Sequence, residues 1–280
     1  MAEYLDDARR FKLIQLLGQG GFGKVYTCLD NQDLQMKAAK VQKNEGALND
    51  ELELFRTLPN TPFLPTLVAD DLNAKNGYIV MSLEGKDLVK VWREAPDHKL
   101  PVEQIISLGY NIMNSLKQLH QNGVIHRDIK LNNLALSRSP GKNPVVLLDL
   151  GMSLRPLQPD GTKDYTMGPG YHFSKHSFSS VRIINGCSPN EMDDVHAVAY
   201  TLLVLRNITF FVQDEAKELE RKTYLNENLE QVLEESDSPL LEKPLRAMLC
   251  QPTEQLPMFN RILGIFQSLP GFDANLCRGL

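Results

Sequence analysis

Apolar residues along this chain change their spacing near residue 80. Before that point they form short β-prone runs, of which the clearest are Leu13–Leu17, Val25–Leu29 and Tyr78–Met81. Beyond it, they recur every three or four positions, as on the buried face of a long helix that ends near Gly123. The positions that carry this helical pattern are Ile105, Leu108, Ile112, Leu116 and Leu119. The pattern predicts strands in the first part of the chain and mainly helices in the rest.

Later segments fit the same division. Val145–Leu148 is a short apolar run that predicts a buried strand leading into Asp149. From Asp194 onward the pattern is mainly helical, and Ala197–Leu205 is almost wholly apolar. Because a helix that is apolar on all sides must be buried, this one is expected at the centre of the helical lobe.

Composition and charge agree with a globular protein of ordinary make-up. A chain of 280 residues can bury a large core, and 42% hydrophobic with 23% charged residues is typical of such proteins. The net charge of −5 gives no basis for broad electrostatic binding of nucleic acid. The four cysteines are scattered without paired spacing, so neither a zinc site nor a disulfide framework is expected.

No segment of the sequence has the features of a membrane anchor or a secretion signal. The apolar runs all fall short of the roughly 20 residues needed to span a bilayer, and the N-terminus is charged. The default expectation is therefore a cytoplasmic or nuclear protein that does not associate with membranes.

The strongest chemical signal is the sequence HRDIKLNN at residues 126–133, with Asp149 following the next apolar strand. Transfer of a phosphoryl group from ATP to a hydroxyl needs a base and metal ligands. Asp128 would accept the proton of the hydroxyl, while Asn133 and Asp149 would each hold Mg²⁺. Lys130 can reach the transferring phosphoryl group and offset its negative charge. These residues resemble the catalytic loop and metal-binding turn of eukaryotic-type protein kinases.

Three residues near this loop are expected to support it. We expect His126 to be a buried hydrogen-bonding residue that stabilises the catalytic loop, rather than an acid or a base. Asp194 stands at the start of a predicted helix, where its carboxylate can accept backbone N–H groups from the catalytic loop. Arg127 is a candidate to pair with an anion in the segment that follows Asp149.

A glycine-rich segment, GQGGFGKV at residues 18–25, lies between two of the predicted strands. A Rossmann turn has similar letters, but such a turn opens a helix, whereas Val25–Leu29 predicts a strand. Taken alone, the segment also fits an ordinary glycine-rich hairpin. In a nucleotide site, glycines let the backbone fold over the phosphates and present N–H donors to them. The nucleotide-binding positions predicted here are Gly18, Gly20, Gly21, Gly23 and Val25.

The sequence MKAAKV at residues 36–41 resembles the kinase strand that carries the lysine for the α- and β-phosphates of ATP. Lys40 is the residue that we assign to this role, in preference to Lys37 and Lys43. Ala38 lies two positions before it, where the resemblance implies a small side chain above the adenine ring.

The phosphate-binding lysine needs an acidic partner on the next helix. The segment after Lys40 has helical spacing of Leu54 and Leu58, with Glu51 about one turn earlier. Matching Leu58 to the last leucine of the family's helix places Glu51 at the position of that partner. Glu53 is the alternative, and we expect it to face solvent.

The strand that ends at Met81 leads into a segment that predicts the hinge between the two lobes. Backbone N–H and C=O groups of a hinge can hydrogen-bond the adenine edge, which constrains the side chains only loosely. Met81 falls at the gatekeeper position, where it would close the back of the adenine pocket. The kinase resemblance implies that Ala135, two residues after Asn133, lies beneath the adenine. The residues predicted to form this pocket are Met81, Ser82, Leu83, Glu84 and Ala135.

Longer matches narrow the resemblance to the casein kinase 1 superfamily. The hinge region, residues 77–88, looks like that of the superfamily, and so do the sequence FLP at 63–65 and the helix start at 193–200. The sequence NLAL at 133–136 is similar to the tau-tubulin kinase branch, and the vaccinia-related kinase-like branch is also close. The absence of an Ala-Pro-Glu motif fits this superfamily, and Pro257–Leu263 resembles its last helix.

The resemblance covers roughly residues 11–270 and implies an α+β fold, the bilobal protein kinase fold. A small antiparallel β lobe would extend over about residues 11–81, and the hinge over 82–86. The larger, mainly helical lobe would follow over about 87–270.

The chain departs from the family pattern at several positions. Leu131 replaces the usual proline of the catalytic loop, and Leu150 replaces the phenylalanine of Asp-Phe-Gly, which keeps apolar side chains at both sites. Pro169 stands where a threonine hydroxyl normally bridges the catalytic Asp and Lys. Residues 191–192, Glu-Met, occupy the place of paired arginines that bind acidic or phosphorylated substrates, and Lys175 with Arg182 would be the substitute.

The resemblance implies a monomeric protein kinase that uses ATP and Mg²⁺ to phosphorylate serine and threonine hydroxyls of protein substrates. The main alternative is a weak or inactive pseudokinase that acts as a binding scaffold, because Pro169 would deform the substrate loop. A kinase of a small molecule fits less well, since the hinge and the last helices point to protein substrates. Thr162, Tyr165 and Thr166 are candidate phosphorylation sites.

Overall fold

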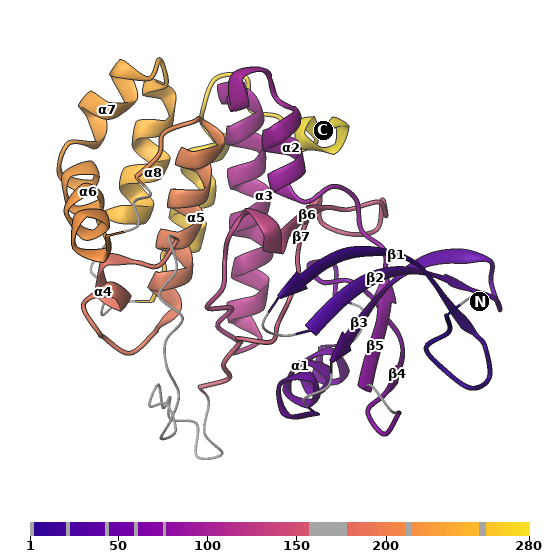
Figure 1. The fold of residues 1–280 in the computed structure, drawn as a ribbon. Helices are drawn as coiled ribbons and strands as arrows, with labels where there is room; N and C mark the ends of the chain where they lie inside the picture. Colours follow the sequence, from indigo (N-terminus) through magenta and orange to yellow (C-terminus); the bar gives the residue numbers. More distant parts are fainter. Residues whose placement is uncertain are drawn as a thin grey trace.

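The computed structural model has a sheet lobe and a helical lobe, and the chain passes from the first to the second at about residue 82 (Figure 1). The structure describes residues 3–20, 23–42, 45–58, 61–74, 77–156, 178–210, 214–251 and 256–280. The sheet lobe carries one helix, α1 (Glu45–Thr57), and most of the other helices lie in the second lobe. This arrangement confirms the bilobal α+β fold that the resemblance to protein kinases implies.

The sheet of the first lobe has five antiparallel strands in the order β1-β2-β3-β5-β4. The predicted runs near residues 13, 25 and 78 all lie in strands of this sheet. The strand β4 was not predicted, because its sequence LVADD ends in two aspartates that are unusual in strands. The bounds are β1 (Phe11–Gly20), β2 (Gly23–Asp30), β3 (Gln35–Gln42), β4 (Leu67–Asp71) and β5 (Gly77–Ser82).

The two faces of this sheet pack against different groups of residues, as the strand register shows. Lys40 on β3 lies opposite Ile79 on β5, so the two side chains share a face. Ile79 packs with Leu48 and Leu52 of α1, which places this helix on the same face as Lys40. The opposite face holds a separate apolar cluster whose buried members are Phe11, Cys28, Ala39, Tyr78 and Val80. Residues of α1 can therefore reach Lys40 without crossing the sheet.

The second lobe is built around α3 (Val102–Gln121) and α5 (Glu191–Leu205), which pack against each other. All five apolar positions that predicted α3 are buried, and Gly123 follows its end with a φ of 71°. A two-stranded sheet, β6 (Leu134–Leu136) with β7 (Val145–Leu147), lies between α3 and the first lobe. The other helices are α2 (Leu88–Glu94), α4 (Val181–Ile184), α6 (Glu215–Glu227), α7 (Leu229–Glu235), α8 (Glu242–Leu249) and α9 (Phe259–Gln267).

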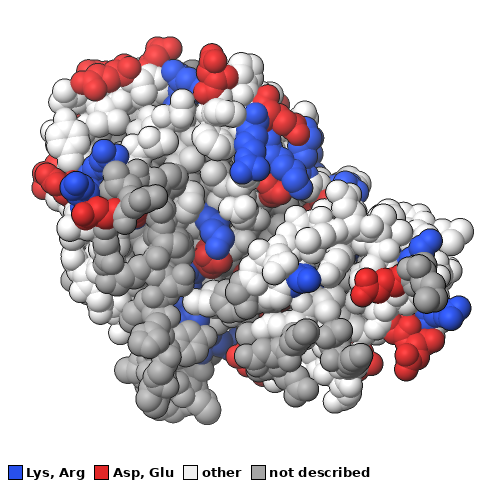
Figure 2. Space-filling model, in the orientation of Figure 1, with Lys and Arg blue, Asp and Glu red and all other residues white. Residues whose placement is uncertain are grey.

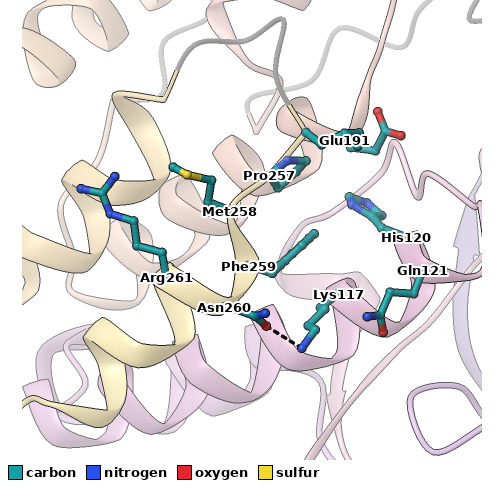
Figure 3. Close-up of a pocket in the computed structure, with 10 residues that line it drawn as sticks. Lys117, His120, Gln121, Glu191, Pro257, Met258, Phe259, Asn260 and Arg261 are labelled. Carbon is teal, nitrogen blue, oxygen red and sulfur yellow. Dashed lines mark hydrogen bonds between the residues drawn. The ribbon is translucent and has the colours of Figure 1, made fainter.

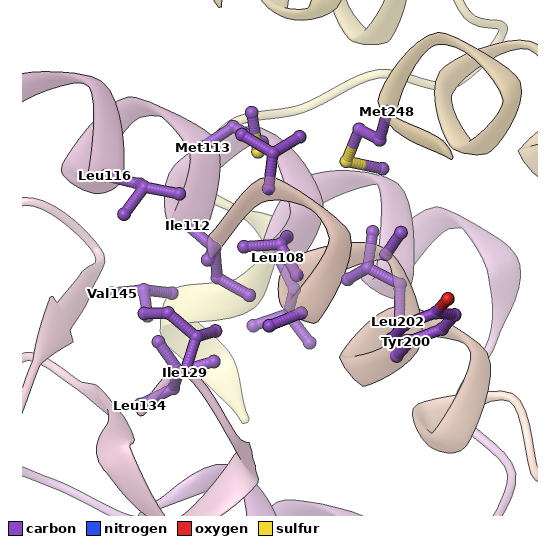
Figure 4. Close-up of a cluster of buried hydrophobic side chains, with 14 of the residues drawn as sticks. Leu108, Ile112, Met113, Leu116, Ile129, Leu134, Val145, Tyr200, Leu202 and Met248 are labelled. Atoms are coloured by element: carbon purple, nitrogen blue, oxygen red, sulfur yellow. The ribbon is translucent and has the colours of Figure 1, made fainter. Parts of the chain in front are cut away.

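The centre of this lobe is α5, in which all 15 residues are buried. Figure 4 shows side chains of α3 and α5 interdigitating with those of α8 and of the small β6–β7 sheet. Helix α5 begins with a capping box. Asn190 accepts a hydrogen bond from the Met192 N–H, and Asp193 accepts one from the Asn190 N–H. The position of α5 confirms the prediction made from the apolar run Ala197–Leu205.

Charged side chains of both signs are intermixed on the face shown in Figure 2. Beside the hinge, Lys86 pairs with Glu94 at 2.7 Å and Lys90 with Asp87 at 3.2 Å, so neighbouring charges neutralise one another. Among the described residues, no helix combines the length and apolar character that crossing a membrane requires.

Candidate active site

The catalytic loop is held by a buried carboxylate from α5. Asp194 accepts the backbone N–H groups of His126 and Arg127, each at 2.8 Å. Arg127 has a φ of 64°, a left-handed backbone conformation that these hydrogen bonds help to maintain. His126 is fully buried, and its Nε2 lies 3.0 Å from the carbonyl oxygen of Leu148. Both structural roles predicted for His126 and Asp194 are confirmed.

Asp194 has a third partner that the sequence did not suggest. His120 on α3 places its Nε2 2.9 Å from Asp194 Oδ2, and both side chains are at least 95% buried. Burial alone would raise the pKa of Asp194, but the hydrogen bonds from His120 and the His126 N–H lower it below its ordinary value. The carboxylate is therefore ionised, and it ties α3, α5 and the catalytic loop together.

Asp128 lies within this loop and is oriented by two neighbours. Lys130 Nζ lies 2.9 and 2.8 Å from the two carboxylate oxygens of Asp128, and Asn133 Nδ2 donates to Oδ2 at 2.8 Å. Asn133 Nδ2 also donates to the Asp128 carbonyl at 2.9 Å, which fixes the amide and turns Oδ1 the other way. The structure thus brings together three of the predicted residues, with Lys130 directed at Asp128.

Lys40, Glu51 and Asp149 form a second cluster that joins the two lobes. Lys40 Nζ lies 2.5 Å from Glu51 Oε2 and 2.7 Å from Asp149 Oδ1. Burial opposes the charge of Lys40, yet the two carboxylates raise its pKa above the ordinary value and keep it protonated. The Lys40 charge and hydrogen bond also lower the pKa of Asp149, against the effect of burial. Glu53 is exposed, so Glu51 is the residue of α1 that meets Lys40.

The turn after Asp149 is fastened to the same glutamate. The Leu150 N–H donates to Glu51 Oε1 at 3.2 Å, and the Leu150 side chain is buried in the main apolar core. Leu131 is buried in that core as well. Both leucines therefore keep the packing expected where the family has other residues.

Asn133 and Asp149 offer oxygen atoms, which are the ligands that Mg²⁺ prefers. Asp149 is 31% exposed at its side chain, and the fixed Asn133 amide leaves its oxygen turned from Asp128. Mg²⁺ in phosphoryl-transfer sites is held by one or two such side chains together with substrate phosphates. The two residues fit this ion.

The glycine-rich segment forms the predicted hairpin between β1 and β2, with Gly20 opposite Gly23. Gly23 has a φ of 109°, and a Cβ there would lie 2.3 Å from the Val41 carbonyl oxygen, so no other residue fits. A Cβ at Gly18 or Gly20 would meet no protein atom. The described part of the protein therefore places no steric demand for glycine at these two positions. Gly21 lies outside the described residues.

Three of the other predicted pocket residues, Val25, Ala38 and Met81, share the face of the first-lobe sheet that bears Lys40. Val25 lies opposite Lys40 across β2 and β3, and Ala38 lies opposite Met81 across β3 and β5. Met81 is half-buried and packs against the α1 cluster and the main core. Ala135 on β6 is buried and forms an isolated bridge with Asp87, just beyond the hinge.

The hinge contains a buried carboxylate whose contacts the sequence did not reveal. Glu84 accepts hydrogen bonds from Ser82 Oγ at 2.7 Å and Ser137 Oγ at 3.3 Å. The Gly85 N–H donates to the Leu136 carbonyl at 2.7 Å, and a Cβ on Gly85 would lie 2.7 Å from that oxygen. The hinge is thus attached to the β6–β7 turn, which fixes the backbone of residues 82–85 relative to the helical lobe.

A separate cavity of about 430 Å³ lies between the end of α3, the start of α5 and the segment that enters α9 (Figure 3). Lys117 donates to Asn260 Oδ1 at 2.8 Å along one side, and the Phe259 ring meets His120 edge-on at 5.4 Å. Glu191 lines this cavity and is buried, while Met192 lies in the core. The two residues that stand in place of paired arginines therefore present no cation.

Arg182, the predicted substitute for those arginines, is already paired. Its Nε lies 3.4 Å from Asp193 Oδ1, and its Nη2 donates to the Ser188 carbonyl at 2.5 Å. Lys175 and Pro169 lie outside the described residues, as do the candidate phosphorylation sites Thr162, Tyr165 and Thr166.

Comparison with known proteins agrees with this geometry. Residues 11–255 match the model of the protein kinase domain. The chain belongs to the protein kinase family. A putative casein kinase I of Caenorhabditis elegans is 22% identical to this kinase over 261 residues, which cover 89% of the kinase and 76% of that protein.

Two further similarities extend the comparison. A probable serine/threonine-protein kinase of Dictyostelium discoideum is 28% identical over 150 residues, or 52% of this kinase, which spans only 30% of that longer protein. The solved structure of vaccinia related kinase 3 has a TM-score of 0.74 with 17% identity, and it covers 96% of this kinase and 89% of that chain. The name of the Caenorhabditis elegans relative confirms the resemblance to casein kinase 1, and the structural match shows the shared fold.

Proposed function

We propose that this kinase transfers the γ-phosphoryl group of ATP to serine and threonine hydroxyls of protein substrates. The observation that carries the proposal is the pairing of Lys40 with Glu51 and Asp149, next to a loop in which Asn133 and Lys130 orient Asp128. A chain that only bound a partner would not need both clusters. The catalytic domain in this proposal spans about residues 11–270.

Each cluster has a separate task. Asp128 accepts the proton of the substrate hydroxyl, because its carboxylate is fixed by two donors and sits on a loop held by Asp194. Lys130 contacts Asp128 and, being 31% exposed, can turn to the transferring phosphoryl group and offset its charge. Lys40 contacts the α- and β-phosphates, while Glu51 keeps its ammonium group in place.

The nucleotide is held by groups of both lobes. Val25, Ala38 and Ala135 enclose the adenine, Met81 closes the pocket behind it, and backbone groups of residues 82–84 meet its edge. Gly18, Gly20, Gly21 and Gly23 cover the phosphates. Mg²⁺, held by Asn133 and Asp149, neutralises phosphate charge when it is bound. A monomer in the cytoplasm or nucleus remains a prediction from the sequence.

The direct test is phosphate incorporation from labelled ATP into casein, a generic acidic protein, in the presence of Mg²⁺. Asp128→Asn should lower kcat by a factor of about 100 to 10,000, because an amide cannot accept the proton. Asp97→Asn is the matched control, since this residue lies on the helical lobe away from both clusters and should keep full activity. Equal turnover by wild type and Asp128→Asn would contradict the role of Asp128.

A binding-only pseudokinase is the second candidate, and the substitution at Pro169 is what favours it. This alternative predicts ATP binding without transfer. ATP affinity measured by calorimetry, together with absence of labelled product on casein and on serine and threonine peptide arrays, would establish it. Incorporation that Asp128→Asn abolishes would exclude it.

A further inference from the structure

The two carboxylate oxygens of Glu84 face different parts of the protein. The residue is 7% exposed, although glutamate is almost never buried unless it is paired. Oε1 accepts the Ser82 hydroxyl at 2.7 Å. Oε2 lies 3.3 Å from Ser137 Oγ and 3.4 Å from the backbone nitrogen of Arg138, which both follow β6 in the helical lobe. One side chain therefore connects the end of β5 to the β6–β7 turn.

Ser82 extends these contacts into the sheet lobe. Its Oγ accepts the Thr66 N–H at 2.8 Å, and its own N–H donates to the Thr66 carbonyl at 2.8 Å. Thr66 directly precedes β4. The Ser82 hydroxyl thus accepts from Thr66 and donates to Glu84, which fixes its orientation. A continuous hydrogen-bond network leads from the sheet lobe through Ser82 and Glu84 to the helical lobe, and such connected bonds polarise one another.

The network surrounds the part of the hinge that is predicted to meet the adenine edge. Leu83 lies between Ser82 and Glu84, the two residues whose side chains are bonded to each other. On the other side, the Gly85 N–H donates to the Leu136 carbonyl at 2.7 Å, and the Leu136 N–H donates to the Lys86 carbonyl at 2.9 Å. The backbone of residues 82–85 is therefore fixed at both of its ends, and the Glu84 carboxylate contributes to both.

We propose that Glu84 is a positioning residue for the adenine base, because its side chain fixes the backbone whose N–H and C=O groups meet the edge of the ring. The inference rests on the proposed function, since it assumes ATP in this pocket. The Glu84 carboxylate contacts Ser82 and Ser137 and acts on the base only through the hinge backbone. Small displacements of positioning groups weaken recognition strongly. Loss of the carboxylate should therefore weaken binding of the base and spare binding of the phosphates, which is assigned to Lys40 and the glycine-rich hairpin.

The decisive variant is Glu84→Gln, which keeps the size of the side chain but replaces two acceptor oxygens by one oxygen and one NH₂ group. In either orientation of the amide, the NH₂ group faces the Ser82 hydroxyl or the Arg138 N–H. One end of the network then loses its acceptor. Glu94→Gln is the matched control, because Glu94 is 57% exposed and pairs with Lys86 of the same hinge from the surface.

The experiment measures the Kd values of adenosine, ATP and tripolyphosphate by calorimetry in the presence of Mg²⁺. Glu84→Gln should raise the Kd for adenosine and for ATP about tenfold, the size expected when one hydrogen bond to a charged group is lost. The Kd for tripolyphosphate should stay within about twofold of the wild-type value, and Glu94→Gln should leave all three within about twofold.

A merely structural role gives a different result. If Glu84 only maintained the pocket as a whole, the affinity for tripolyphosphate would fall together with that for adenosine. Equal losses for the two probes would therefore overturn the proposal. Unchanged adenosine affinity in a folded Glu84→Gln protein would also overturn it, since the base would then be placed without the carboxylate.

A second readout needs neither nucleotide nor activity. Hydrogen exchange of the Gly85 and Leu136 amides should be at least about tenfold faster in Glu84→Gln than in the Glu94→Gln control, because the hinge loses one of its attachments. If wild type binds neither ATP nor adenosine, the proposed function fails, and the exchange measurement still tests the attachment of the hinge. Unchanged exchange of both amides would overturn the positioning role of Glu84 in either case.

Discussion

Replacing Asp194 by asparagine should loosen the catalytic loop and destabilise the whole protein. The carboxylate receives three hydrogen bonds: Oδ1 accepts the Arg127 N–H, while Oδ2 accepts the His126 N–H and the His120 ring. An asparagine side chain has one oxygen and one NH₂ group. If its oxygen serves His126 and His120, its NH₂ faces the Arg127 N–H, and two donors then meet.

The size of the effect follows from these contacts. Each charge-assisted hydrogen bond contributes roughly 1.5–3 kcal/mol, and a neutral one about half as much. Asp194→Asn loses one such bond, weakens the other two and leaves a buried N–H without an acceptor. We expect the free energy of unfolding to fall by about 3–5 kcal/mol, as for other buried charged networks that lose one partner. The exposed Asp50→Asn change on α1 should cost less than about 0.5 kcal/mol.

The assay is urea denaturation of both variants at pH 7, monitored by circular dichroism. The kcat of each protein is measured in parallel. The pKa of Asp194 is lower folded than unfolded, so its stabilisation is present above an unfolded pKa of about 3.9 and is lost as the pH falls through the folded pKa. The difference between wild type and Asp194→Asn should stay constant from about pH 5 to 7 and shrink below about pH 4. A loss under about 1 kcal/mol with unchanged kcat would refute this reasoning.

Three further predictions concern the nucleotide and the substrate. Asp149→Ala should weaken Mg²⁺-dependent ATP binding at least about tenfold in calorimetry, while ATP binding without Mg²⁺ changes little. Equal losses of ATP affinity with and without Mg²⁺ would argue against Asp149 as a metal ligand. Met81→Gly should admit an N6-benzyl ATP analogue and lower the free energy of unfolding by about 2–5 kcal/mol. A folded variant with wild-type analogue selectivity would place Met81 outside the adenine pocket. Peptide arrays should show at most about threefold selection for phosphoserine or aspartate three residues before the acceptor, because Glu191 and Met192 offer no donor and Arg182 is paired with Asp193. Tenfold selection would contradict that prediction.

Much of the candidate site could be predicted from the sequence because its chemistry is local. Asp128 and Asn133 lie five residues apart on one loop, and the motif became specific through His126-Arg127 before it and the apolar strand leading into Asp149 after it. Lys40 and Glu51 lie on consecutive elements, β3 and α1, and matching Leu58 to the last leucine of the family's helix selected Glu51 over Glu53. The positions of α3 and α5 followed from apolar periodicity, which depends on burial alone.

Contacts between side chains far apart in the sequence could not be predicted in this way. Glu84 and Lys222 have charged side chains, which usually face solvent, and nothing in their neighbours indicates that Ser137 or Ser179 would be their partners. The role of His120 was equally hidden, because a histidine at the end of a helix has many possible environments. Such pairs depend on how the lobes pack, which one sequence does not specify.

The bond between Lys222 and Ser179 has a consequence for how this kinase can evolve. Lys222 binds a main-chain carbonyl, and every amino acid supplies the same group. Mutations at Ser179 can therefore change its side chain without removing the attachment. An insertion between the adjacent residues Ser179 and Ser180 would instead move this carbonyl relative to the cap of α4. Substitutions at Ser179 should therefore be tolerated, while Ser179 and Ser180 stay adjacent.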